Sequence, residues 1–142
     1  MLRMDEDAMD DELTLWQQRL DISPFQRWLG LRVAAIGDGL IEIGLDWREE
    51  LVSNPTTRSM HGGILASLID LGGLYAVLTT KSVAVTTVDL RVDYHRPLSA
   101  GRIQATSRVL RLGSKVSSAE TTITDADGKL IASGRGVYLM AS

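Results

Sequence analysis

The sequence predicts an α+β domain of two layers, in which one long apolar helix packs against a meander of about five or six antiparallel strands. The helix is predicted by residues 64–80, a run of seventeen in which Asp70 carries the only charge. The strands are predicted by segments that alternate apolar and polar side chains and are separated by hairpin turns.

The chain opens with an acidic segment, since residues 1–12 carry six carboxylates against one arginine. We expect this segment to be a disordered tail and residues 13–142 to form a single domain. The remainder of the chain has a net charge of +2 once the tail is set aside. A mildly basic body of this kind suits a ligand that carries phosphate groups.

Two short helices are predicted before the first strand. Apolar side chains recur at helical spacing over residues 11–20, which predicts an amphipathic helix. In the second helix Ser23 is the expected N-cap, Pro24 occupies the first helical position and Gly30 ends the helix.

The strands follow in chain order. The first two, 31–36 and 40–47, flank the turn Gly-Asp-Gly at 37–39, and an irregular loop over 49–60 leads into the long helix. After the helix, one strand has Val88, Leu90, Val92 and Tyr94 on its predicted buried face. The last three strands are expected at 102–112, 115–124 and 129–140.

One helix covers only part of a sheet this wide. We therefore expect an exposed edge strand, and dimerisation is the usual way in which proteins cover such an edge.

The composition excludes several classes of function. Hydrophobic residues make up 44% and charged residues 23% of the 142, with a net charge of −3. The chain therefore lacks the surplus of basic residues that would indicate nucleic-acid binding. The absence of cysteine excludes disulfides, thiolate zinc sites and a cysteine nucleophile. The acidic start is unlike a signal peptide, and the helix over 64–80 contains Asp70, so we expect a cytoplasmic protein that does not enter membranes.

Asp70 and the start of the long helix are the candidate chemical groups. A carboxylate in an apolar helix is costly unless it is paired or used. Gly62 and Gly63 present unpaired amides at the positive end of the helix, where a developing oxyanion is stabilised. Eight residues separate Gly62 from Asp70, roughly 12 Å along a helix axis, so both groups serve one carbonyl only if two antiparallel helices meet in a dimer.

These residues also resemble a known family. His61-Gly62-Gly63, six residues and then Asp70, followed by Val-Asp-Leu-Arg-Val-Asp-Tyr over 88–94 and by Arg96-Pro97, is similar to the PaaI-like (phenylacetic-acid-degradation type) hotdog-fold acyl-CoA thioesterases. The resemblance covers about residues 23–140. It implies one long helix wrapped by a curved antiparallel sheet, in dimers joined edge to edge and often in homotetramers.

The resemblance implies an activity and a set of roles. The enzyme would hydrolyse an aryl- or fatty-acyl thioester of CoA without a metal or another cofactor. Asp70 would act as base or nucleophile and the Gly62 amide would polarise the carbonyl. Asn54 and His61 would flank that amide, and Thr87 would help to hold a water molecule beside Asp70.

Contacts with the substrate are expected at the dimer interface and at basic side chains. Gly63, Ile64 and Leu68 are the expected pocket residues on the helix. Basic side chains are candidates for the CoA phosphates, chiefly Arg91, Arg96 and Lys115.

Two other kinds of function remain open at this point. A hotdog hydratase or dehydratase would use a histidine and an acid in one site. A non-catalytic acyl-CoA-binding protein, or a subunit that has the fold without activity, would use the pocket alone.

Overall fold

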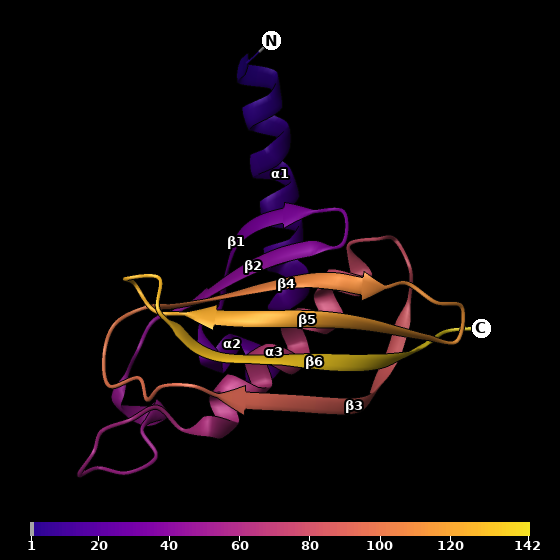
Figure 1. Ribbon diagram of the computed structural model, residues 1–142. Coiled ribbons are helices and arrows are strands. Elements are labelled where there is room, and N and C mark those ends of the chain that lie inside the picture. The colour runs from indigo at the N-terminus through magenta and orange to yellow at the C-terminus, as the bar shows by residue number, and fades with distance from the viewer. Residues whose placement is uncertain (1) are drawn as a thin grey trace.

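The computed structural model describes residues 2–142, with side chains from residue 5 onward, and shows a six-stranded antiparallel sheet wrapped around one helix (Figure 1). That helix is α3, Gly62–Leu78. The strands are β1 (Arg32–Gly37), β2 (Leu40–Leu45), β3 (Ala84–Tyr94), β4 (Ile103–Arg111), β5 (Val116–Thr124) and β6 (Leu130–Met140). The predicted α+β class and all six strands are confirmed.

The order of the strands across the sheet is β1-β2-β4-β5-β6-β3, which differs from the predicted meander. The strand β3 does not lie between its sequence neighbours but at the far edge, paired with β6. The cause is α3, which carries the chain across one face of the sheet between β2 and β3. The helix thereby packs on β2 to β6, and the two edges of the sheet are β1 and β3.

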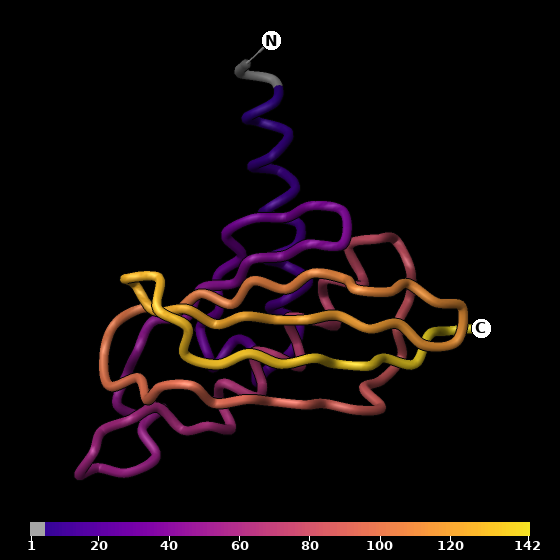
Figure 2. Tube along the Cα trace, in the orientation of Figure 1, coloured from indigo at the N-terminus to yellow at the C-terminus, as the bar shows by residue number. Residues whose placement is uncertain are grey.

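The structure corrects one prediction about the two helices that precede the sheet. The short helix α2 (Pro24–Leu29) has the predicted Ser23 cap and ends at Gly30, whose φ of 72° is left-handed. The first helix, α1 (Leu2–Leu20), begins nine residues earlier than expected and includes the acidic segment predicted to be a disordered tail. Carboxylates near the positive end of a helix favour such an extension, and α1 stands out beyond the sheet (Figure 2). None of the helices in residues 2–142 has the length and apolar character that crossing a membrane requires.

The helix α3 approaches the sheet closely at two glycines. A Cβ on Gly72 would collide with the Ser107 hydroxyl of β4, and a Cβ on Gly73 would collide with the Tyr138 hydroxyl of β6. Tyr138 is fully buried, and its hydroxyl donates to the backbone oxygen of Asp70 at 2.8 Å. The glycines therefore have the packing role that the sequence predicts, and they fix the depth of Asp70 above the sheet.

The edge strand β3 is bulged, and this corrects one predicted face. Its pairing with β6 shifts register between Thr87 and Asp89, which leaves Val88 opposite no partner. A bulge turns the side chains on one side of it relative to those on the other. Val88 is consequently 53% exposed rather than buried, while Thr87 points at α3. Tyr94, also predicted on the buried face, is the last residue of β3 and is 57% exposed.

We predict that Gly73→Ala destabilises the protein, although alanine is the better helix former by about 1 kcal/mol. The added methyl group meets the Tyr138 hydroxyl, and overpacking of this kind costs about 1–3 kcal/mol. Urea unfolding followed by circular dichroism measures the change. Ala66→Gly, on the same helix, calibrates the propensity term.

The same measurement on the double variant assigns the cause. With Tyr138→Phe the hydroxyl is absent, so Gly73→Ala should cost less than it does in the wild type. A Gly73→Ala protein more stable than the wild type would contradict the close approach as the reason for the glycine.

Candidate active site

The entry to α3 leaves one backbone amide unused. The His61 amide donates to the Leu51 oxygen at 2.7 Å, and the Gly63 amide donates to His61 Nδ1 at 2.8 Å. Between them, the Gly62 amide has no hydrogen-bond acceptor within the part of the chain that the structure describes. As the first residue of the helix, Gly62 has no backbone acceptor four residues before it inside α3.

The loop that leads to this amide is held on two sides. Besides the bond to Leu51, the amide of Met60 donates to the oxygen of Leu98 at 2.7 Å, which ties the loop to the segment after β3. The helix therefore begins at a fixed place. A free amide at the positive end of a fixed helix can bind the oxygen of a polarised carbonyl without reorganisation.

Asp70 lies two turns further along the helix and is half-buried. Its Oδ1 accepts a hydrogen bond of 2.6 Å from the hydroxyl of Thr87. The bulge in β3 makes this contact, because it turns Thr87 toward the helix. One carboxylate lone pair is thus fixed, and the second oxygen is left for a substrate or a water molecule.

The turn of α3 that carries Asp70 is also fixed from the sheet. The Tyr138 hydroxyl bonded to the Asp70 backbone has a raised pKa, chiefly because of its burial and in addition because of the nearby Asp70 charge. The hydroxyl therefore remains a protonated donor. No local sequence pattern predicts this role, since Tyr138 lies 68 residues from Asp70 along the chain.

His61 is the N-cap of α3 and is exposed. Because its Nδ1 accepts from Gly63, the proton of the neutral ring is assigned to Nε2. Asn54 is exposed on the loop before the helix, and its Oδ1 accepts from the Thr56 amide at 2.9 Å. The Asn54 side chain is thus engaged in a local turn within its own loop.

The predicted pocket residues have different surroundings. Leu68 is fully buried in the core, Ile64 is half-buried against it, and Gly63 is exposed beside His61. A cavity of about 270 Å³ adjoins Gly62. Its lining, which the sequence did not single out as a group, is Ser59, Met60, Gly62, Leu65, Tyr94, His95, Arg96, Pro97 and Leu98.

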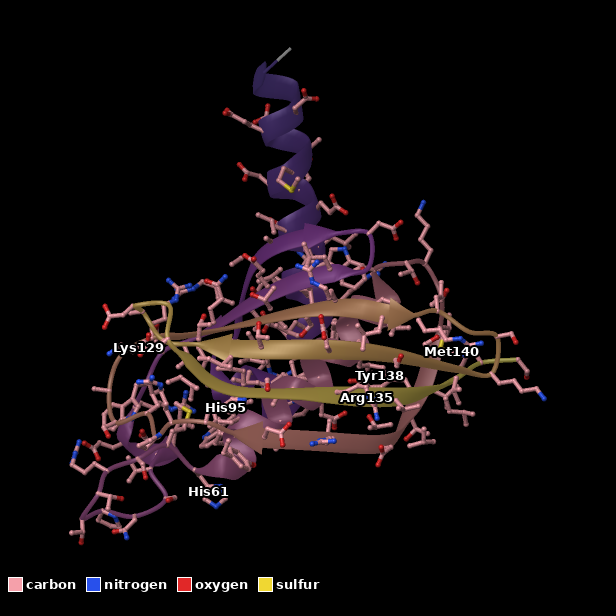
Figure 3. The ribbon with its side chains drawn as sticks, in the orientation of Figure 1. His61, His95, Lys129, Arg135, Tyr138 and Met140 are labelled. Carbon is pink, nitrogen blue, oxygen red and sulfur yellow. The ribbon has the colours of Figure 1, made fainter. Side chains whose placement is uncertain are left out.

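The predicted basic residues are separated within one chain. Arg96 lines the cavity beside Gly62. Arg91 lies on the outer face of the sheet, 3.5 Å from the carboxylate of Asp93. Lys115 lies at the end of the sheet opposite to Arg96, where its backbone oxygen accepts a hydrogen bond from the Met140 amide. In Figure 3, His61 and His95 lie toward one end of the sheet and Met140, whose amide bonds to Lys115, lies at the other.

The site is built from a carboxylate, hydroxyls and backbone amides. Among the described side chains, no group of three or more histidine, aspartate or glutamate residues lies close enough to bind a metal ion.

The architecture described above, one long helix wrapped by a curved six-stranded antiparallel sheet, is the hotdog fold of thioesterases. A family model described as the thioesterase superfamily matches residues 58–132. The chain belongs to this superfamily and is a thioester hydrolase, as the sequence predicts.

Individual relatives agree with this assignment. The medium/long-chain acyl-CoA thioesterase YigI of Salmonella typhimurium is 33% identical, over 82% of this chain and 85% of its own. A solved thioesterase-superfamily structure has a TM-score of 0.86 and 43% identity, over 91% of this chain and 98% of that one. The PaaI protein of Escherichia coli, from the phenylacetic acid degradation operon, shares the fold with a TM-score of 0.80 at 22% identity, over 89% and 93% of the two chains. The predicted resemblance to PaaI-like proteins is confirmed.

We predict that Thr87→Val lowers kcat for thioester hydrolysis by roughly 10- to 100-fold, because a hydrogen bond to a charged group is lost. Thr87→Ser keeps the hydroxyl that donates to Asp70 Oδ1 and should retain most of the activity. Release of free thiol measures both rates. Equal activity in the valine and serine variants would show that the hydroxyl has no part in catalysis.

Proposed function

We propose that the protein hydrolyses acyl-CoA thioesters to the free acid and CoA, at sites formed by two subunits. Asp70 of one subunit provides the carboxylate, and Gly62 of the other provides the amide that binds the carbonyl oxygen. Two groups on α3 support this proposal most directly. The Gly62 amide has no acceptor among the described residues, and the Asp70 carboxylate is held by the hydroxyl of Thr87.

The residue types suit this reaction. As base, Asp70 would take a proton from water while the water oxygen bonds to the thioester carbon, and negative charge would build on the carbonyl oxygen at the Gly62 amide. The C–S bond then breaks, and the proton held by Asp70 passes to the departing sulfur. As nucleophile, Asp70 would instead bond to the thioester carbon and displace the CoA thiolate, and water would cleave the resulting mixed anhydride to the free acid and the Asp70 carboxylate.

The spacing on α3 supports a site shared by two subunits. Eight residues along a helix separate the two groups by roughly 12 Å, whereas a thioester carbon and its oxygen must lie within about 3 Å of their partners. An antiparallel helix from a second copy brings the opposite group within reach. The strand β3 lies at the edge of the sheet and exposes Val85 and Val88, so it offers backbone groups and apolar side chains to the sheet of a second copy.

The acyl group is proposed to be a fatty acyl chain. YigI, which matches most of this chain, is named a medium/long-chain acyl-CoA thioesterase. Arg96, in the cavity beside Gly62, is the basic side chain best situated to attract CoA phosphates toward the site.

The central test is thiol release from aryl, short-chain and long-chain acyl-CoAs by the wild type and by Asp70→Asn. We expect turnover with long chains, and a fall in kcat of about 10²- to 10⁴-fold in the variant, because the carboxylate that activates water is gone. Undiminished hydrolysis by Asp70→Asn would refute the mechanism. Hydration of an enoyl thioester would favour a hydratase, and saturable binding without turnover would favour a binding protein.

A second prediction concerns the Gly62 amide. Gly62→Pro removes the N–H at the first helical position, where proline is accepted, and the ψ of 129° at His61 lies in the range that a residue before proline adopts. We expect kcat to fall by about 10²- to 10³-fold, as for the loss of an oxyanion donor. Gly62→Ala keeps the N–H and adds the Cβ, so it controls for crowding, and equal losses in both variants would contradict the role of the amide.

Mixing the two inactive variants tests whether the site spans two subunits. A dimer of one Asp70→Asn chain and one Gly62→Pro chain has one site with both groups intact, so random exchange should restore about a quarter of the wild-type rate. If each site lies within one chain, mixing restores nothing.

A further inference from the structure

The peptide group between Gly62 and Gly63 is held at both of its ends. Its oxygen, on Gly62, accepts a hydrogen bond of 2.8 Å from the hydroxyl of Tyr94. Its N–H, on Gly63, donates to Nδ1 of His61, also at 2.8 Å. Because a peptide group is planar, two bonds at opposite ends fix its orientation.

The ring of Tyr94 also lies against the α-carbon of Gly62. A Cβ built on Gly62 would be 3.2 Å from the ring atoms Cε1 and Cζ and from the hydroxyl oxygen, closer than ordinary van der Waals contact. The ring therefore occupies the side of Gly62 where any other residue would carry its side chain. Gly62 is restrained by the ring on one side and by the fixed peptide group that follows it.

From these contacts we propose that Tyr94 is a positioning residue, which holds the Gly62 amide in the orientation that receives the carbonyl oxygen. This inference rests on the proposed function of that amide. When negative charge develops on the carbonyl oxygen, an amide that has to rotate loses part of its stabilising effect. The Gly62 N–H belongs to the preceding peptide group, whose oxygen on His61 accepts a hydrogen bond from the Ile64 amide at 3.0 Å. Because Tyr94 and His61 fix the peptide group on the other side of Gly62, and the Tyr94 ring packs against the Gly62 α-carbon, the backbone at Gly62 has little freedom to turn this N–H.

Because Tyr94 lies on β3, one strand restrains both candidate catalytic groups of α3. Thr87, on the same strand, holds Asp70, and Tyr94 holds Gly62. Seven residues separate them, an odd number that would place them on opposite faces of a regular strand. The bulge between Thr87 and Asp89 removes this mismatch, so both hydroxyls point at α3.

The test is Tyr94→Phe, which keeps the ring against Gly62 and removes only the hydroxyl. We expect kcat to fall by roughly 3- to 10-fold, the value of one neutral hydrogen bond, while KM changes less than twofold. Tyr75→Phe is the matched control, because the Tyr75 hydroxyl bonds to the oxygen of Arg19 on α1, away from Gly62. That variant should keep the wild-type kcat.

The Gly62→Pro background distinguishes positioning from direct contact with the substrate. Without the N–H there is nothing left to position, so adding Tyr94→Phe should lower kcat no further. An equal fall in both backgrounds would overturn the proposal, and so would an unchanged kcat or a rise in KM alone.

Amide hydrogen exchange gives a readout that needs no turnover. The Gly63 amide should exchange faster in Tyr94→Phe than in the wild type, and an unchanged exchange rate would overturn the proposed restraint. If Gly62→Pro abolishes hydrolysis and Tyr94→Phe does not alter it, only the role of Tyr94 fails. If the wild type hydrolyses no thioester, the proposed function itself fails.

Discussion

The close approach of α3 to the sheet is the constraint on which the rest of the molecule depends. It is made possible by Gly72 and Gly73, which leave room for hydroxyls of β4 and β6 directly under the helix backbone. One of these hydroxyls, on Tyr138, donates to the backbone of Asp70. Burial and the Asp70 charge both raise the pKa of this phenol, so it remains a donor across the physiological range. The close packing of α3 on the sheet therefore also determines where the Asp70 carboxylate lies.

The strand β3 supplies the second constraint, because it lies at the edge of the sheet and yet anchors both chemical groups on α3. Its bulge lets Thr87 and Tyr94 face the helix together, and the same bulge exposes Val88. Bulges are frequent at sheet edges and beside active sites, where they redirect a side chain. In this chain the bulge at Val88 aligns two hydroxyls toward α3 and leaves the apolar side chain of Val88 exposed.

The sequence predicted the long helix, its glycine entry, the cap at Ser23 and all six strands, because each has a local signal in periodicity or turn chemistry. It did not predict the position of β3 at the far edge or the bulge, since no local pattern records which strands pair. The candidate site divides in the same way. Gly62 and Asp70 follow from a motif on one helix, whereas Tyr94 and Tyr138 reach that helix only through tertiary structure.

The dual use of β3 has a consequence for how catalysis depends on assembly. If a second copy pairs with this edge, it restrains the strand that carries Thr87 and Tyr94, and so it restrains the carboxylate and the amide as well as supplying the opposite halves of the sites. Separation of the subunits would then remove activity for two reasons. Each Asp70 would lose the amide of its partner, and each α3 would be held by a strand with one free side. An edge strand paired on both sides opens less readily than one paired on a single side, so the dimer would act on the geometry of the site as well as on its composition.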